Sequence, residues 1–250
     1  MSWTSPEAST STPTSRASGS SRLQRWVALQ PMAYDAVLLD LYDTLVWSDW
    51  YAWQGRLADR LGITVPEIGE AFSRTRSARN TGATVDTEGD VTLVLRAADI
   101  EPAPDLVAEL LDWEREMGES IRLYDDALEV VRSLRERRVP VALVSNCSHN
   151  TTPIVERLGL EREFDAVLLS FEVGAMKPDP AIYREALARL GDPDPARSVF
   201  VDDQVAYCDG AAAVGLQTFL ILRPEEALEG HPVDLNGHRP IETLRPLLED

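Results

Sequence analysis

The chain has 250 residues, of which 44% are hydrophobic and 26% are charged, and its formal net charge is -18 at pH 7. It is long enough to bury a sizeable core, and no apolar run approaches the ~18 residues that cross a bilayer. The negative charge argues against a general affinity for nucleic acid, which depends on Lys and Arg at the phosphates. The only two cysteines, Cys147 and Cys208, fit a reducing compartment, so we expect a cytoplasmic protein with no membrane partner.

The N-terminal region is rich in Ser and Thr, short of apolar residues and without periodicity. Such a composition buries too little apolar surface to offset the entropy lost on folding. We therefore expect a disordered tail over residues 1–32.

From Tyr34 onward, short β-rich runs alternate with helical patterns. The runs are VLLD (37–40), VPVALVSN (139–146), AVLLS (166–170), SVFVDD (198–203) and LQTFLIL (216–222). This alternation predicts parallel strands joined by crossover helices. Two of these helices show an apolar stripe, formed by Leu128, Val131 and Leu134 and by Ile182, Leu187 and Leu190. We expect an α/β fold, a Rossmann-like doubly wound parallel sheet, over 33–47 and 121–250.

Residues 48–120 interrupt this alternation, because they hold only amphipathic helical segments such as 49–62 and 104–118. We interpret them as an inserted α-helical cap in which Trp50, Tyr51 and Trp53 pack inside a small bundle. The insert follows the first strand directly. It should therefore lie over the carboxyl ends of the strands, where ligands bind in open α/β sheets, and act as a lid.

Four groups of polar residues follow the predicted strands. They are Asp40 with Thr44, Ser145 with Asn146, Lys177 in GAMKPDP, and Asp202 with Asp203. Taken singly, most have an ordinary structural explanation as turn or cap residues or as a surface charge. Because strand ends converge on one crevice, all four groups are expected to meet there.

In this order the motifs resemble those of the haloacid dehalogenase (HAD) superfamily of hydrolases, over roughly residues 36–222. The motifs are a strand-Asp with a following Thr-Leu, a strand-Ser-Asn, Lys-Pro-Asp-Pro opening a helix, and a strand-Asp-Asp before the helix DGAAAVG. The resemblance implies a hydrolase with a Rossmann-like core and a cap.

The resemblance also implies roles for individual residues. Asp40 would be the nucleophile, because a carboxylate can form an acyl-phosphate and split one hard displacement into two easier steps. Thr44 and Ser145 would bind the oxygens of the transferring group, and Asn146 would help to orient the ligand. Lys177 would neutralise charge on Asp40 and on that group.

A metal site is implied in the same way. Asp202 would be a ligand together with a carboxylate oxygen of Asp40 and the main-chain carbonyl of Tyr42. Asp203 would act directly or through another ligand. Hard oxygen ligands of this kind suit Mg²⁺.

Tyr42 stands where most phosphatases of this superfamily carry a second aspartate that protonates the leaving group. General acid–base catalysis is typically worth ~10²–10⁴-fold, so its loss should be felt most with poor leaving groups. Tyrosine also occupies this place in the metal-independent 2-haloacid dehalogenases, but those enzymes carry neutral Ser and Asn where this chain has Asp202 and Asp203. Two like charges about 5 Å apart repel by roughly 3 kcal/mol at an effective dielectric of ~20, so three carboxylates beside one lysine favour a divalent cation.

We therefore expect a Mg²⁺-dependent phosphatase acting on a small anionic substrate, a phosphomonoester. The alternatives are a metal-independent 2-haloacid dehalogenase and a binding protein that keeps the fold without turnover. Either Tyr42, whose phenol can donate a proton, or Asp43 replaces the missing acid, and the alternative for Asp43 is that it only stabilises the turn. Arg74, Arg76 and Arg79 either bind a remote anionic part of the substrate or form a solvated helix face. The sequence leaves monomer and homodimer open.

Overall fold

The central sheet has six strands within the described part of the chain, in the order β5-β4-β1-β6-β7-β8, and all neighbouring pairs are parallel. The computed structural model describes residues 34–223 and 235–249. The tail predicted for residues 1–32 lies outside these residues. The strands are Ala36–Leu39 (β1), Val141–Ser145 (β4), Ala166–Leu169 (β5), Ser198–Asp202 (β6), Gln217–Ile221 (β7) and Arg239–Ile241 (β8).

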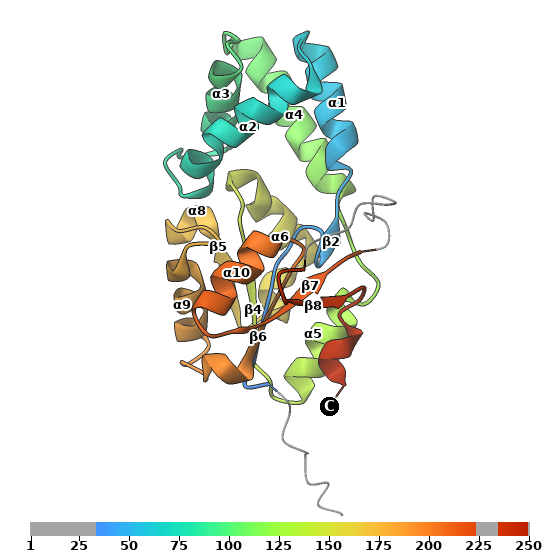
Figure 1. Ribbon diagram of the computed structural model, residues 1–250. Helices are drawn as coiled ribbons and strands as arrows, with labels where there is room; N and C mark the ends of the chain where they lie inside the picture. Colours follow the sequence, from blue (N-terminus) through green and yellow to red (C-terminus); the bar gives the residue numbers. More distant parts are fainter. Residues whose placement is uncertain (1–33, 224–234, 250) are drawn as a thin grey trace, which may run out of the picture. The chain divides into compact units, whose positions relative to one another are not determined.

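Helices cover both faces of this sheet (Figure 1). They are Ala127–Glu136 (α5), Thr152–Leu158 (α6), Leu160–Glu163 (α7), Ser170–Val173 (α8), Pro180–Arg189 (α9) and Val205–Ala213 (α10). Short 3₁₀ helices lie at His149–Thr151 (η1), Pro195–Arg197 (η2) and Arg245–Leu248 (η3).

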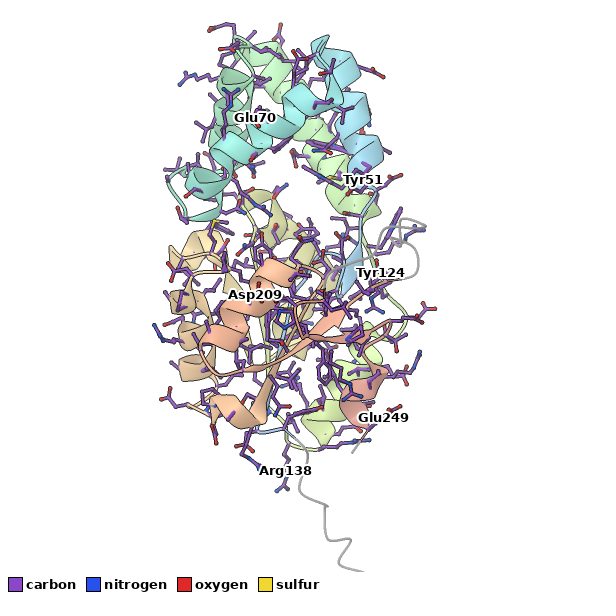
Figure 2. The ribbon with its side chains drawn as sticks, viewed as in Figure 1. Tyr51, Glu70, Tyr124, Arg138, Asp209 and Glu249 are labelled. Atoms are coloured by element: carbon purple, nitrogen blue, oxygen red, sulfur yellow. The ribbon has the colours of Figure 1, made fainter. Side chains whose placement is uncertain are left out.

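Alternate residues of β1 belong to the two separate cores that these helices cover. Val37 and Leu39 pack in a cluster with residues of α5 and α6, whereas Ala36 and Leu38 pack in a cluster with residues of α9 and α10. The side chains drawn in Figure 2 fill the layers between strands and helices. A strand buried on both faces needs an unbroken apolar run, which explains AVLL in β1. The predicted α/β, doubly wound sheet is confirmed.

The two predicted helix stripes lie on α5 and α9. Val131 and Leu134 of α5 are fully buried, and Leu128 is partly buried. Helix α9 begins where Asp179 accepts a hydrogen bond from the Ala181 amide over 2.8 Å. Just beyond its end, Gly191 has a φ of 87°, a conformation that favours glycine and stops a helix.

Between the first strand and the rest of the core lie four helices, which we call the cap helices. Their bounds are Trp50–Leu61 (α1), Val65–Asn80 (α2), Thr87–Ala97 (α3) and Pro104–Ser120 (α4). Helix α2 starts at a capping box in which Thr64 and Glu67 satisfy each other's backbone amides. Trp53 is buried as expected, but the expectation is wrong for Tyr51, which is 80% exposed. Residues separated by two positions lie on different sides of a helix.

The sixth strand, β8, and one small antiparallel pair were not predicted. Val46–Trp47 (β2) and Arg122–Leu123 (β3) form an antiparallel pair in which Val46 faces Leu123. Strands of two residues are too short to show a hydrophobic period. The pair joins the two chain segments that connect the cap helices to the sheet.

No helix within residues 34–223 and 235–249 combines the length and the apolar character needed to cross a membrane.

Candidate active site

Three of the predicted site residues meet at the carboxyl edge of the sheet. Asp40 lies directly beyond β1, and its carboxylate accepts a hydrogen bond from the Lys177 ammonium. The same ammonium donates to Oδ2 of Asp202 over 2.6 Å. Asp202 ends β6, the parallel neighbour of β1, and Lys177 comes from the loop between α8 and α9. All three are buried. The strand pairing explains why side chains so distant in sequence converge.

Asp203 completes the group. One carboxylate oxygen from each of Asp40, Asp202 and Asp203 can be chosen so that all three lie within 4.8 Å of one another. Asp202 is oriented by the Gln204 amide, which donates to its Oδ1 over 2.8 Å. Asp203 is less buried and accepts a hydrogen bond from the Gln204 side chain. We call these three aspartates the acidic cluster.

Burial and mutual repulsion set the charge of the acidic cluster. Burial, which outweighs the attraction of Lys177, raises the pKa of Asp40 to about 7. Burial raises the pKa of Asp202 and of Asp203 to about 6. For Lys177, burial acts to lower the pKa, but Asp202 and Asp40 outweigh it and hold the pKa above its ordinary value. The lysine therefore stays charged, and one lysine does not balance three carboxylates.

The donor atoms of the acidic cluster fit a divalent cation. Mg²⁺ prefers oxygen ligands and is commonly held by one or two carboxylates together with waters and a substrate phosphate. Three carboxylates and one ammonium carry a formal charge of -2 when all are ionised, so a divalent ion restores neutrality. The predicted fourth ligand, the Tyr42 carbonyl, belongs to the turn just beyond Asp40.

Asn146 holds the loop that carries Lys177. Its Nδ2 donates to the Lys177 carbonyl over 2.8 Å, and its Oδ1 accepts from the Lys177 amide over 2.7 Å. Gly210 of α10 packs on the next residue of this loop, where an added Cβ would lie 2.6 Å from the Pro178 carbonyl oxygen. The glycine of the DGAAAVG motif therefore allows α10 to approach the lysine loop. A ligand-orienting role of Asn146 stays a prediction.

The hydroxyls of Thr44 and Ser145 are buried without a hydrogen-bond partner among the described residues. Leaving a buried polar group unpaired costs about 1–3 kcal/mol, so such groups are rare unless they serve a purpose. Thr44 lies in the turn beyond β1, and Ser145 is the last residue of β4, which pairs with β1. They are therefore available to donate to an acceptor, although neither residue lines the cavity described next.

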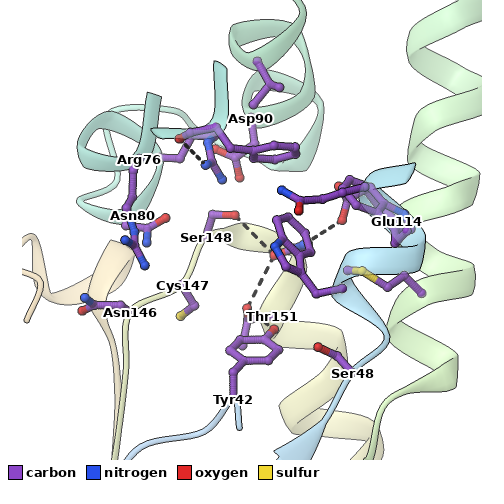
Figure 3. A pocket seen from close by; sticks show the side chains of 18 of the residues that line it. Tyr42, Ser48, Arg76, Asn80, Asp90, Glu114, Asn146, Cys147, Ser148 and Thr151 are labelled. Carbon is purple, nitrogen blue, oxygen red and sulfur yellow. Dashed lines mark hydrogen bonds between the residues drawn. The ribbon is translucent and has the colours of Figure 1, made fainter. Parts of the chain in front are cut away.

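A cavity of about 460 Å³ lies over the acidic cluster. Its wall combines residues from the sheet edge with residues from all four cap helices. Figure 3 shows Tyr42, Thr151, Ser148 and Glu114 around this space. The charged side chains in its wall are those of Asp40, Asp43, Arg76, Arg79, Asp90, Glu114, Lys177 and Asp203.

Two residues of the first turn face the cavity. The Tyr42 hydroxyl lies 3.0 Å from Oγ1 of Thr151, and burial raises the pKa of its phenol well above the ordinary value. Asp43 has a φ of 59°, and its amide donates to the Val46 carbonyl over 2.8 Å. This left-handed conformation favours glycine and tolerates aspartate. It accounts for Asp43 in the turn, and whether Asp43 also moves protons stays a prediction.

The three arginines of α2 differ in position. Arg76 and Arg79 line the cavity, whereas Arg74 donates to the Ala97 carbonyl and lies 3.9 Å from Glu70. Arg79 also donates to the Phe72 carbonyl over 3.1 Å. Only two of the three are therefore placed to meet a ligand.

Sequence reasoning missed a buried arginine behind the site. Arg223 donates to the Thr44 carbonyl and to Oδ1 of Asp126 over 2.9 Å, and both charged residues are almost fully buried. Asp126 in turn accepts from the Leu244 amide. The network ties the turn beyond β1 to the C-terminal segment. Arg223 ends an apolar run and belongs to no motif, so no local signal identified it.

Two hydrogen-bonded contacts between the cap helices and η1 were also missed. Asp90 of α3 accepts from the His149 amide over 3.2 Å and lies 3.1 Å from its Nδ1. Glu114 of α4 accepts from Nδ2 of Asn150 over 2.7 Å. Contacts between residues 36 and 59 positions apart leave no mark on a hydrophobic period.

Comparison with known proteins places these features in a family. A family model described as haloacid dehalogenase-like hydrolase matches residues 34–215. Haloacid dehalogenase-like hydrolase domain-containing protein 3 of Bos taurus is 36% identical over 121 residues, which cover 48% of this chain and 47% of that protein. Ribulose-1,5-bisphosphate 5-phosphatase of Halopiger xanaduensis is 36% identical over 159 residues, which cover 60% and 64% respectively. The match spans less than two thirds of either relative.

A crystal structure of a dehalogenase with an intermediate complex is also similar, with a TM-score of 0.62 and 24% identity. The alignment covers 86% of this chain and 96% of that one. At this identity the likeness supports the fold.

Proposed function

Because the chain belongs to the haloacid dehalogenase-like hydrolases, as the matched family model shows, we propose that it is a Mg²⁺-dependent phosphatase of a small phosphomonoester. This membership confirms the family that its sequence motifs resemble. The observation that carries the finer proposal is the acidic cluster of Asp40, Asp202 and Asp203 around the single ammonium of Lys177. A similar chain, from Halopiger xanaduensis, is a ribulose-1,5-bisphosphate 5-phosphatase.

The first proposed step is attack by the Asp40 carboxylate. An oxygen of Asp40 forms a bond to phosphorus, and the bond from phosphorus to the leaving oxygen breaks with its electron pair on that oxygen. In the second step a water attacks phosphorus, the bond to Asp40 breaks, and inorganic phosphate leaves. Splitting one displacement in this way lowers each barrier.

Lys177 serves both steps in this proposal. Its ammonium contacts the nucleophile and Asp202 at once, so the attacking carboxylate is held in place before substrate binds. The same positive charge opposes the negative charge that the transferring group brings. The unpaired hydroxyls of Thr44 and Ser145 offer donors to its oxygens.

A bound Mg²⁺ would supply charge neutralisation for the phosphoryl oxygens. Asp40, Asp202 and the Tyr42 carbonyl would hold it, with Asp203 as a direct or supporting ligand. The rest of the chemistry belongs to the chain itself, which positions the nucleophile, covers the site with the cap helices and keeps Lys177 charged.

A second candidate is a metal-independent 2-haloacid dehalogenase, and Tyr42 is the observation that favours it. In that reaction Asp40 would displace halide from carbon, and water would hydrolyse the resulting ester. The acidic cluster stands against this candidate, because an enzyme without a metal gains nothing from two further acids beside its nucleophile.

An assay matrix tests the proposal. The protein is incubated with p-nitrophenyl phosphate or 2-chloropropionate, each with Mg²⁺ and with EDTA. We expect release of phosphate with Mg²⁺ only, since p-nitrophenolate leaves without much help from an acid. If the protein releases chloride in the presence of EDTA and shows no phosphatase activity, the dehalogenase is the correct function and the phosphatase proposal is wrong.

A third possibility is a protein that keeps the site without turnover. Beryllium fluoride, which mimics a phosphoryl group on aspartate, distinguishes a working nucleophile from an inactive one. We expect it to bind in the presence of Mg²⁺ and to raise the melting temperature, and we expect Asp40→Asn to lose this effect.

A further inference from the structure

The proposed phosphatase lacks an obvious acid for its leaving group. Tyr42 occupies the usual place of that acid, and its hydroxyl is already within hydrogen-bond distance of Thr151. Burial holds the pKa of the phenol above its ordinary value. A phenol of this kind is a poor base at neutral pH, when water must be activated in the second step. Another carboxyl in the cavity would serve better.

Five acidic residues line the cavity, and they differ in how their oxygens are used. Asp40 and Asp203 belong to the acidic cluster. Asp90 accepts from Thr84 over 2.6 Å with Oδ1 and contacts the His149 amide and ring with Oδ2. Asp43 is held in the turn by a left-handed backbone. Glu114 remains.

Glu114 combines a free oxygen with a fixed position. Its Oε2 accepts from Nδ2 of Asn150 over 2.7 Å, and within the described residues no hydrogen bond reaches its Oε1. The side chain is only partly buried and lines the cavity. Figure 3 shows it on the cap side of the space that Tyr42 and Thr151 face from the core.

The neighbours of Glu114 link it to the nucleophile. Asn150 precedes Thr151, the residue whose Oγ1 lies 3.0 Å from the Tyr42 hydroxyl. Tyr42 is two residues beyond Asp40, and Glu114 is close enough to add to the electrostatic field at its phenol. Tyr42 and Glu114 both line the cavity into which the organic part of a phosphate ester bound at Asp40 would extend.

The surroundings of Glu114 suit an acid. The pKa of Glu114 lies above its ordinary value, chiefly because the side chain loses hydration in the cavity wall. The negative charge of Asp90 also raises this pKa, whereas the hydrogen bond from Asn150 and the positive charge of Arg79 lower it. A carboxyl protonated on Oε1 can still accept the Asn150 hydrogen bond on Oε2. Burial near neighbouring charges is the usual way in which enzymes bring a carboxyl toward the pH at which it exchanges protons.

We propose that Glu114 of cap helix α4 is the proton donor to the leaving oxygen, at a position of the chain distant from the usual acid. This inference rests on the proposed phosphatase function. As the bond from phosphorus to the leaving oxygen breaks, that oxygen takes the proton of Glu114 and leaves as an alcohol. The Glu114 carboxylate then accepts a proton from the water that attacks phosphorus, which restores the starting state.

The test compares leaving groups in the full-length protein with Mg²⁺. The variants are Glu114→Gln, which keeps an acceptor for Asn150, and the control Glu116→Gln on the same helix, whose target is an exposed partner of Arg56. Each is assayed with p-nitrophenyl phosphate, whose leaving group is a stable anion, and with 2-phenylethyl phosphate, whose leaving group needs a proton. Asp43→Asn and Tyr42→Phe are assayed in parallel.

We expect Glu114→Gln to lower kcat/KM for 2-phenylethyl phosphate by about 10²-fold and for p-nitrophenyl phosphate by less than about threefold. Glu116→Gln should change neither. Equal losses on both substrates would mean that Glu114 only holds the cap to Asn150, and no loss on either would exclude it as the acid. A selective loss in Asp43→Asn or Tyr42→Phe instead would move the role to that residue.

Folding is checked by the melting temperature of each variant. Should Glu114→Gln unfold, Glu114→Asp replaces it, and a carboxyl withdrawn by one methylene should still give the selective loss on 2-phenylethyl phosphate. A wild-type protein that releases no phosphate from either substrate overturns the phosphatase proposal and this one with it, whereas the pattern among variants concerns Glu114 alone.

Discussion

The Lys177 ammonium lies 2.6 Å from Oδ2 of Asp202, and it also contacts the carboxylate of Asp40. The Lys177 ammonium therefore links Asp202, the last residue of β6, to Asp40, the residue directly beyond the neighbouring strand β1. Removing one partner from a buried ion pair leaves an uncompensated charge, which is far more costly than losing an exposed pair.

Replacing Lys177 with methionine should therefore destabilise the fold by about 3–5 kcal/mol at neutral pH. The loss should be smaller at about pH 5, because protonated carboxyls need no counter-ion. Urea unfolding at the two pH values measures both effects. The control is Arg189→Met, which removes an exposed pair with Glu185 and should cost less than about 0.5 kcal/mol. Similar losses in the two variants would contradict a buried, charged site.

Addition of Mg²⁺ should stabilise the protein increasingly as the pH rises. Burial raises the pKa of Asp40 to about 7 and that of Asp202 to about 6, whereas unfolded aspartate titrates near 4. The folded, metal-free state binds more protons between these values, so its stability falls as the pH rises through them. Mg²⁺ competes with protons for the same carboxylates, so its binding should offset this loss of stability.

Calorimetry with Mg²⁺ and with EDTA measures this effect. The rise in melting temperature caused by Mg²⁺ should grow from about pH 5 to about pH 8. The Asp202→Asn variant should show little rise in melting temperature when Mg²⁺ is added. An effect of Mg²⁺ that is independent of pH, or that survives in Asp202→Asn, would place the ion elsewhere.

Gly210→Ala should disturb the lysine loop. The added methyl group would lie 2.6 Å from the Pro178 carbonyl oxygen, so α10 or the loop must move. We expect a loss of at least about 1–3 kcal/mol in stability, as for other overpacked sites, together with lower activity. In Gly55→Ala the methyl group meets nothing within 4 Å on helix α1, and stability should rise by roughly 0.5–1 kcal/mol. A neutral Gly210→Ala would show that the loop adapts freely.

Arg76→Ala should weaken substrate binding. Arg76 lines the cavity, whereas Arg74 on the same helix is bonded to the Ala97 carbonyl. If the substrate carries a second anionic group, KM should rise about tenfold with little change in kcat, since about 1.4 kcal/mol of binding is lost. Arg74→Ala is the control. An equal rise in KM in both variants would mean that the overall positive charge of α2, and not a contact made by Arg76, favours substrate binding.

The sequence motifs were sufficient to predict the sheet and the meeting of Asp40, Lys177 and Asp202. Apolar runs such as AVLL fix a strand buried on both faces, and parallel strands bring their carboxyl ends to one edge. Helices α1 and α4 of the cap also followed from local patterns, because segments 49–62 and 104–118 each carry an apolar stripe.

The residues that sequence missed depend on contacts across the fold. Arg223 bonds Thr44 and Asp126 over separations of 179 and 97 residues. The pairing of β2 with β3 and the contact of Glu114 with Asn150 likewise join distant segments. Such contacts are set by packing, and single residues in a loop or at the end of a run carry no period from which to infer them.

The most direct test of the central claim is to identify the covalent intermediate on Asp40. The protein is mixed with p-nitrophenyl phosphate and Mg²⁺, quenched with sodium borohydride, which reduces an aspartyl-phosphate to homoserine, and digested for mass spectrometry. We predict homoserine at residue 40, absent when EDTA replaces Mg²⁺ and absent in Asp40→Asn. Phosphate release with an unmodified Asp40 and modification of another residue, or an adduct at Asp40 formed only with 2-chloropropionate in EDTA, would contradict the account.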